Sequence, residues 1–354
     1  QDPFLGWLSA LLVTSRRAVI CLAALVLSLA MVGLFALDPP VSPLLWFVLM
    51  LSLVFSAFSF LAINFYAQGV LKAQRLGAVG HLQLARWRET GALTGICIAA
   101  AAPAAFAYIS ASPFALFAGL FAVVTCLAAL LMLREWDSRM EYRPQAIVKI
   151  LKDRTARQVL LMGLINAAPV AVTSTLFLFY VEARLGAPAA AGPLLLTFFL
   201  AAAVTAPGWT FLAEKFGTKR VLFGAMLLAI FSLLWVLGFD RGDVVGFGVV
   251  CLLSGAAVGA DMTLLPAVFA ARIARISASP HESFGLWSFV SKFSLAFAAV
   301  LLLPTLENAG FRAGEENSEA ELRLLTVIYA LVPCGLKLLA IAVLQRTELK
   351  EIEV

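Results

Sequence analysis

Long apolar segments alternate with short polar loops along the whole chain of 354 residues. A helix needs about 20 apolar residues to cross the hydrocarbon core of a bilayer. Hydrophobic residues make up 62% of the chain and charged residues 13%, against about a quarter charged in soluble domains. We therefore predict an all-α integral membrane protein whose complete spans are 18–37, 44–66, 89–109, 114–133, 158–181, 193–212, 220–239, 244–268, 284–304 and 323–344. Residues 1–12 are expected to be the end of one more helix.

Positive charge is concentrated in every second loop. Of the 26 Lys and Arg residues, 20 lie after residues 12, 66, 133, 212 and 268 or in the C-terminal tail, and four lie in the opposite loops. By the positive-inside rule, the richly charged side faces the cytoplasm. We expect a multi-pass protein of the plasma membrane, in a bacterium the inner membrane, with a cytoplasmic C-terminus. The net charge of +5 then reflects topology and does not indicate a nucleic-acid partner.

The longest cytoplasmic segment divides the chain into halves. We therefore predict that the chain has three parts: an N-terminal bundle (1–133), a linker (134–157) and a C-terminal bundle (158–354). Ile147, Val148, Ile150 and Leu151 give the linker an amphipathic stretch that favours a helix lying at the membrane interface. The second half has six spans and the first has four and a helix end. Equal halves would imply a parent of twelve helices, truncated here at its N-terminus.

A loop motif occurs at equivalent places in the two halves. In the second half, an acidic and a basic residue precede a glycine turn, and a basic pair follows the turn. These residues are Glu214, Lys215, Gly217, Lys219 and Arg220. Glycine suits a tight turn, and the charges are able to bridge helix ends at a cytoplasmic gate. The motif resembles the loop signature of the major facilitator superfamily, which implies two six-helix bundles. The copy in the first half is degenerate, with Ala10 where the acid belongs.

Four other stretches occur in a characteristic order: residues 1–7 (QDPFLGW), 175–180 (TLFLFY), 259–267 (GADMTLLPA) and 285–292 (GLWSFVSK). Together they resemble the glycoside–pentoside–hexuronide:cation symporters, the melibiose permease family. The resemblance implies that Asp2 binds a coupling cation, and that Arg86 and Arg88 belong to a gate. A helix-end cap or a neutral acid is the alternative for Asp2, and a positive-inside anchor is the alternative for the two arginines. The chain departs from the family near Asn64, where an acid is missing.

Ionisable groups inside spans are costly and are functional candidates by default. At 1.5 Å per residue, Asp261 and Lys292 are expected at similar depth in the cytoplasmic half of the bilayer. We predict that they pair, directly or through a neighbouring residue, beside a central cavity. In the alternative, Lys292 extends to the cytoplasmic surface and Asp261 bonds within a kink near Pro266. Lys337 is expected to reach the inner surface with its ammonium group.

Polar uncharged side chains are candidates for the lining of the cavity. An Asn amide has four bonding positions to satisfy, so Asn64 and Asn166 are expected there, with Tyr66 near the first. Helix packing is the alternative. Trp287 is able to stack on a sugar ring. His81 and His281 have no catalytic partner at useful spacing and are expected to be solvated.

These features predict a secondary active transporter whose two bundles rock about a site near the midplane. Its expected partners are the lipid bilayer and a small solute, a sugar or other polar organic molecule, and we expect a monomer. No cofactor is expected beyond a coupling ion, Na⁺ or H⁺. The alternatives are a lipid or lysolipid transporter of the same fold and a non-transporting sensor or scaffold. An enzyme is disfavoured, because clustered His, Asp, Glu or Ser residues are missing.

Overall fold

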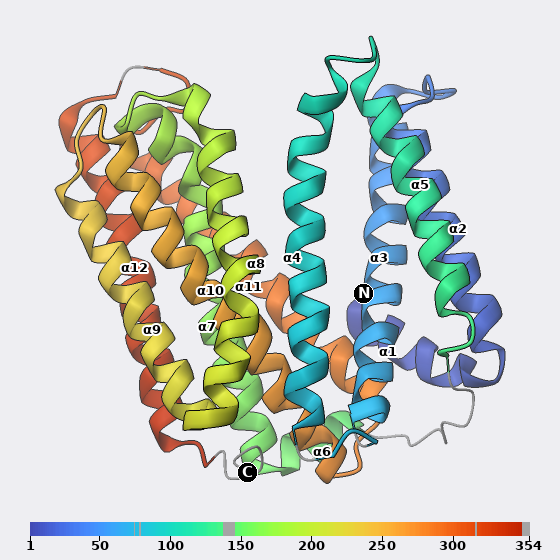
Figure 1. The fold of residues 1–354 in the computed structure, drawn as a ribbon. Coiled ribbons are helices and arrows are strands. Elements are labelled where there is room, and N and C mark those ends of the chain that lie inside the picture. Colours follow the sequence, from blue (N-terminus) through green and yellow to red (C-terminus); the bar gives the residue numbers. More distant parts are fainter. Residues whose placement is uncertain (74, 78, 137–145, 316, 349–354) are drawn as a thin grey trace. The chain divides into compact units, whose positions relative to one another are not determined.

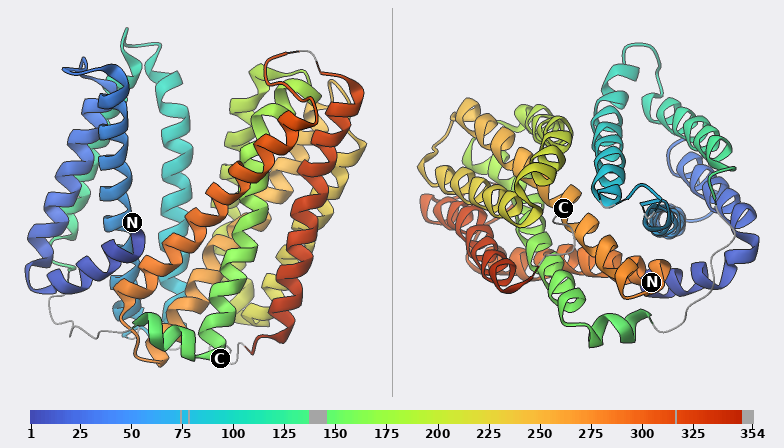
Figure 2. Two further views of the ribbon diagram at one scale, coloured as in Figure 1. Left: turned by 180° about the vertical axis from the view of Figure 1, so that it is seen from behind. Right: turned by 60° about the horizontal axis from the view of Figure 1, so that its bottom comes forward.

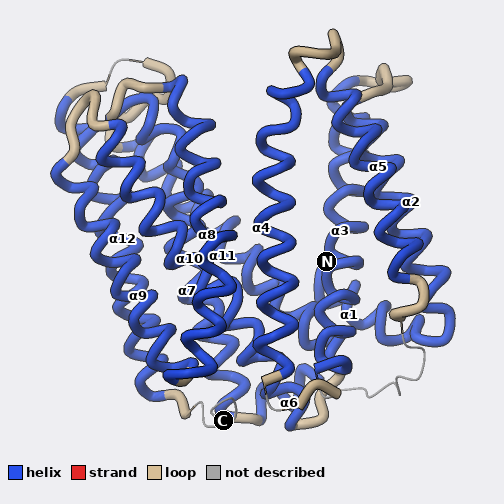
Figure 3. The backbone as a smooth tube through the Cα atoms, viewed as in Figure 1, coloured by secondary structure: helices blue, strands red, loops and turns tan. Residues whose placement is uncertain are grey.

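The computed structural model describes the chain except residues 74, 78, 137–145, 316 and 349–354 (Figure 1). In the described part, every regular element is a helix (Figure 3). The α-helices are α1 (Asp2–Leu11), α2 (Arg16–Phe35), α3 (Pro43–Ala73), α4 (Gly80–Phe106), α5 (Pro113–Met132), α6 (Ala146–Lys152), α7 (Arg154–Phe179), α8 (Ala191–Phe216), α9 (Thr218–Trp235), α10 (Val244–Arg275), α11 (Pro280–Asn308) and α12 (Glu319–Arg346). Four short 3-10 or π turns complete the list: η1 (Leu12–Ser15), η2 (Tyr180–Arg184), η3 (Pro188–Ala190) and η4 (Val236–Gly238).

Ten helices of the described chain are long and apolar enough to cross a membrane, and they coincide with the ten predicted spans. The predicted end of a further helix is α1. Several helices extend beyond their apolar part: α3 has 31 residues, and α4 begins at Gly80 where the apolar span was expected from residue 89. Apolarity marks the hydrocarbon region, whereas backbone hydrogen bonding continues a helix into water.

The helices form two compact units, each described here by itself. Unit 1 comprises Gln1–Lys72, Ile98–Ile150 and Ile273–Phe289. Unit 2 comprises Ala73–Cys97, Leu151–Arg272 and Val290–Val354. The division of the sequence into bundles at 1–133 and 158–354 stays a prediction.

In unit 1, α2 and α5 pack along each other. The rings of Phe35 at the end of α2 and Phe114 at the start of α5 stack 5.9 Å apart, so the two helices run antiparallel. Another close contact joins α1 to the first turns of α11. A Cβ at Gly6 would lie 2.6 Å from the carbonyl oxygen of His281, and one at Gly285 would lie 2.8 Å from that of Asp2. Only glycine permits this backbone approach.

In unit 2, α12 packs along α7 and α9, and α8 packs on α9 (Figure 2). One end of this unit holds an aromatic cluster. The ring of Tyr180 lies 4.7 Å from that of Tyr329 and 5.0 Å from that of Phe247, between centroids. All three side chains are buried. The cluster therefore joins the end of α7 to α10 and α12.

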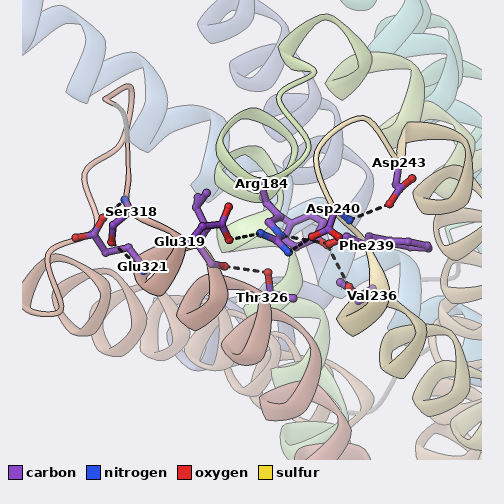
Figure 4. A network of polar contacts seen from close by, with 11 residues as sticks. Arg184, Val236, Phe239, Asp240, Asp243, Ser318, Glu319, Glu321 and Thr326 are labelled. Carbon is purple, nitrogen blue, oxygen red and sulfur yellow. Dashed lines mark hydrogen bonds and ion pairs between the residues drawn. The ribbon is translucent and has the colours of Figure 1, made fainter.

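Arg184 ties together three chain segments beside this cluster (Figure 4). It donates to the carbonyl oxygen of Phe239 at 3.2 Å, to Asp240 at 2.5 Å and to Glu319 at 3.1 Å. Ser318 and Glu321 form a capping box at the start of α12, which satisfies backbone N–H groups that a helix leaves open at its beginning. The network holds η2, the loop before α10 and the start of α12 in one arrangement.

The linker contains the predicted amphipathic helix, α6, although linker residues 137–145 lie outside the described chain. Directly after α6, Asp153 caps α7 by accepting the N–H of Ala156 at 2.7 Å. Arg272 near the end of α10 also forks onto this carboxylate, with N–O distances of 2.9 and 2.5 Å. The hydrogen bonds from Arg272 hold the pKa of Asp153 below its ordinary value, and the bond from Ala156 acts in the same direction to a smaller extent. Partial burial of the carboxylate opposes them by raising the pKa.

The contact of α8 with α10 depends on two glycines one helical turn apart. A Cβ at Gly255 would lie 2.2 Å from the carbonyl oxygen of Phe198, and one at Gly259 would lie 2.7 Å from that of Ala202. Gly255→Ala is therefore expected to lower the free energy of unfolding by about 1–3 kcal/mol, measured by thermal unfolding in detergent. Gly248→Ala on the same helix is the control, because its new Cβ would meet only a Leu194 methyl group at 3.6 Å. Equal losses in both variants would contradict the packing argument.

The Asp153–Arg272 pair predicts a pH dependence. Because the folded pKa is lowered, the stabilisation is complete above the ordinary pKa of 3.8 and is lost as the pH falls through the folded value. Asp153→Asn keeps a capping side chain and removes the charge. It is expected to lower the free energy of unfolding by roughly 1–2 kcal/mol at pH 7, and this difference should shrink below pH 3.8. Asp38→Asn, at an exposed loop carboxylate, should show little difference at either pH.

Candidate functional site

Three polar side chains meet inside unit 2, each from a different helix. They are Asn166 of α7, Asp261 of α10 and Lys337 of α12, and their exposed fractions are 3%, 6% and 1%. The ammonium Nζ of Lys337 donates to Asn166 Oδ1 at 2.6 Å and to Asp261 Oδ2 at 2.5 Å. We call these residues the buried triad. A buried charge is tolerated only when it is paired and hydrogen-bonded, and both charged members meet that condition.

The carboxylate of Asp261 has more acceptor capacity than the triad uses. Within the described residues, its second oxygen, Oδ1, is buried and has no hydrogen-bond partner. Leaving a buried acceptor unsatisfied costs about 1–3 kcal/mol, and more for a charged group. Such an orphaned atom in a native structure calls for an explanation, for example a functional role or a bound water or ion.

Proline lies close to each member of the buried triad. Pro169 follows Asn166 in α7, Pro266 follows Asp261 in α10, and Pro333 precedes Lys337 in α12. An interior proline has no N–H for the carbonyl four residues earlier. The carbonyls without that backbone donor are those of Ile165, Met262 and Tyr329. Two of them neighbour Asn166 and Asp261 directly in the sequence.

Two expectations about the intramembrane charges are wrong. Asp261 pairs with Lys337, so direct pairing with Lys292, which lies partly buried on α11, is wrong, whereas pairing through a neighbouring residue stays a prediction. Lys337 does not extend to the inner surface, because its side chain is enclosed in unit 2. Sequence position gives the depth of a side chain in the membrane but not the direction in which it leaves its helix. Lys292 and Lys337 were similar in depth, and only the packing of α12 against α7 identifies the partner.

In unit 1, Asp2 is 2% exposed, and its Oδ2 accepts a hydrogen bond of 2.8 Å from the Ser288 hydroxyl on α11. This bond lies one residue past Trp287, which is partly buried, and beside the close contact of Gly6 with Gly285. The predicted cation ligand is thus enclosed at the α1–α11 contact. A cation at Asp2 would have the hydroxyl of Ser288 as a neutral oxygen neighbour.

Asn64 and Tyr66 on α3 contact other helices of unit 1. Asn64 Oδ1 accepts the hydroxyl of Ser9 at 2.8 Å, and its Nδ2 donates to the Phe60 carbonyl at 2.8 Å. The ring of Tyr66 lies 4.9 Å from that of Phe284. These contacts join α3 to α1 and α11. A role for either residue in a cavity stays a prediction.

A buried cluster of Arg16, Trp136 and His281 was not found from the sequence. Arg16 bonds to the ring nitrogen of His281 at 2.8 Å and lies 5.7 Å above the ring of Trp136. His281 is 1% exposed, so the expectation that it is solvated is wrong. It occupies the second position of α11, and the close approach of α1 buries it. No local pattern links residues so distant in sequence.

The predicted gate residues show a tight turn but little ion pairing. Gly217 alone connects α8 to α9 and has a φ of +88°, which favours glycine. Lys219 donates to the Gln345 and Thr347 carbonyl oxygens at the end of α12, both at 2.9 Å. Glu214, Lys215 and Arg220 are exposed. Among the described residues, Glu214 has no ion pair.

The first-half gate residues, Arg86 and Arg88, lie inside α4, which begins at Gly80, whereas the predicted span began at residue 89. Arg88 pairs with the buried Glu89 at 2.7 Å, and the guanidinium of Arg86 lies 5.7 Å from the ring centroid of Trp87.

No group of three or more His, Cys, Asp or Glu residues in the described chain has a metal-site arrangement.

The buried triad predicts strongly non-additive mutations. Lys337→Met removes the ammonium and leaves Asp261 charged and buried, so we expect a loss of about 3–5 kcal/mol in the free energy of unfolding. Lys337→Met combined with Asp261→Asn removes both charges and should recover most of that loss. Thermal unfolding of both single variants and the double variant completes the cycle. Additive losses would contradict a direct pair.

The sequence matches the family described as MFS/sugar transport protein over residues 1–351. A comparison with curated proteins found no match.

Solved structures of similar fold include a variant of the E. coli fucose:proton symporter FucP, with a TM-score of 0.67, 15% identity and coverage of 96% of this chain and 86% of that chain. A bacterial homologue of the iron transporter ferroportin has a TM-score of 0.64 and 14% identity, with 98% and 87% covered. The proton:xylose symporter XylE has a TM-score of 0.63 and 14% identity, with 98% and 83% covered. At these identities the likeness shows the fold alone. The chain belongs to the MFS/sugar transport protein family, and it is an integral membrane transporter of the major facilitator fold, not an enzyme.

Proposed function

We propose that this transporter moves a sugar or another small polar organic solute together with a cation, Na⁺ or H⁺, by alternating access. The observation that carries the proposal is a buried aspartate in each unit, Asp2 and Asp261, within apolar helices. Intramembrane charges usually mark ion or solute pathways. The family description names sugar transport, and FucP and XylE are by name proton symporters of sugars.

The proposed roles follow from the resemblance and from the contacts. Asp2 binds the exchangeable cation, with Ser288 beside it. Asn64, Tyr66, Asn166, Asp261, Trp287 and Lys292 are the proposed cavity and coupling residues. The cytoplasmic gate consists of the first-half arginines within α4 and of the charged residues on either side of the turn between α8 and α9: Arg86, Arg88, Glu214, Lys215, Gly217, Lys219 and Arg220. The protein functions as a monomer in the bacterial inner membrane with its C-terminus in the cytoplasm, and it needs no cofactor besides the coupling ion.

The test is solute uptake by the natural full-length protein in proteoliposomes. The panel contains fucose, xylose, melibiose and a lysolipid, each under an imposed Na⁺ or H⁺ gradient or none. We expect at least one sugar to accumulate above its external concentration, only under a cation gradient. Movement of the lysolipid alone would favour the lipid transporter, and movement of no solute would favour a sensor or scaffold.

Variants assign the cation role within the same assay. Asp2→Asn keeps a similar shape and removes the charge, so gradient-driven accumulation should fall to the level of protein-free liposomes. Asp38→Asn, in an exposed loop, should transport like the natural protein. Undiminished accumulation in Asp2→Asn would remove Asp2 from the coupling mechanism.

A further inference from the structure

The buried triad offers an oxygen environment suited to a monovalent cation. Asn166 Oδ1 and Asp261 Oδ2 come from different helices and lie 2.6 and 2.5 Å from one point, the Lys337 nitrogen. Carboxylate and carbonyl oxygens are the ligands of hard cations in proteins, and carbonyls at helix breaks bind Na⁺ in transporters. The carbonyls of Ile165 and Met262, which Pro169 and Pro266 deprive of their helix donor, belong to residues directly beside Asn166 and Asp261.

Two observations distinguish this arrangement from an ordinary ion pair. The carboxylate has a second buried oxygen that nothing among the described residues satisfies, so the site holds more acceptors than the lysine fills. The positive charge belongs to the ammonium group of Lys337 on α12. Its nitrogen atom makes the hydrogen bonds to the oxygens of Asn166 on α7 and Asp261 on α10. A free cation of similar size would find the same ligands.

We propose that the buried triad is a monovalent-cation site permanently occupied by the ammonium group of Lys337. The single negative charge of Asp261 fixes the class of ligand. One positive charge makes the site neutral, whereas a divalent ion would leave a net charge buried at high cost. While Lys337 is present, Na⁺ has no place there, so unit 2 behaves as cation-loaded at every step of a transport cycle.

The contacts around the site keep it formed when the ammonium is absent. Gly255 and Gly259 hold α10 on α8 by backbone approach just before Asp261. Arg272 holds the end of α10 at the start of α7 through Asp153. These contacts flank Asp261 along α10 and involve neither Lys337 nor Asn166. Shortening Lys337 should therefore open a vacancy lined by oxygens without separating the helices.

The test compares two substitutions of Lys337. Lys337→Ala opens the vacancy, and Lys337→Met fills it with an apolar chain of similar length. Thermal unfolding of the detergent-purified full chain is measured in choline chloride, NaCl, KCl and methylammonium chloride at equal ionic strength. A ligand that binds only the folded state raises the unfolding midpoint with its concentration. We expect this rise for Lys337→Ala with Na⁺ or methylammonium, and a flat response for the natural protein and for Lys337→Met.

A double variant tests the role of the carboxylate. Lys337→Ala combined with Asp261→Asn should lose the cation response, because the charged ligand is gone. If Lys337→Ala yields folded protein in none of the salts while this double variant folds in all of them, the proposal is overturned. A folded Lys337→Ala with the same midpoint in every salt also overturns it. These measurements need no transported solute, so they stand apart from the uptake test of the proposed function.

Discussion

A charge in an apolar interior must be neutralised where it lies, and the arrangement of unit 2 follows from that requirement. Asp261 and Lys337 are 6% and 1% exposed, so neither reaches water. Each would be strongly destabilising without the other. Their contact fixes the rotation of α10 and α12 about their own axes, since only one orientation of each helix brings both groups together. Asn166 then determines how α7 faces the pair.

Small residues make this orientation possible. The hydrophobic effect does not drive association between helices in lipid, so close packing and polar contacts have to do so. The glycines of α10 allow its backbone to touch α8, and the Gly6–Gly285 contact does the same for α1 and α11 in unit 1. In both places a buried acid lies within a few residues of the glycines, Asp261 in one and Asp2 in the other. Close backbone approach thus excludes water from the neighbourhood of each carboxylate.

The sequence was sufficient for the helices, the Gly217 turn and the amphipathic helix of the linker, because hydrophobic length, glycine and periodicity are local signals. It also identified Asp261 and Asn166 as polar groups that needed an explanation. It failed for the partner of Asp261, because α11 and α12 each carry a lysine at similar depth and depth alone does not choose between them. It failed for His281 because that residue is buried by α1, which lies more than 250 residues earlier in the chain. Both failures concern contacts between helices distant in sequence.

The described contacts of the two buried aspartates bear on coupling. Asp2 accepts a hydrogen bond from the hydroxyl of Ser288, a neutral group that can reorient toward a bound ion. Asp261 is held by an ammonium that is covalently part of α12. A cation that is to be carried across the membrane must leave its site in each cycle, and a tethered one cannot. With the proposed exchangeable ion at Asp2, the two units divide the work. Unit 1 then contributes a site that loads and empties, and unit 2 contributes the same chemistry with the cation built in, so that only one ion need be translocated for each solute.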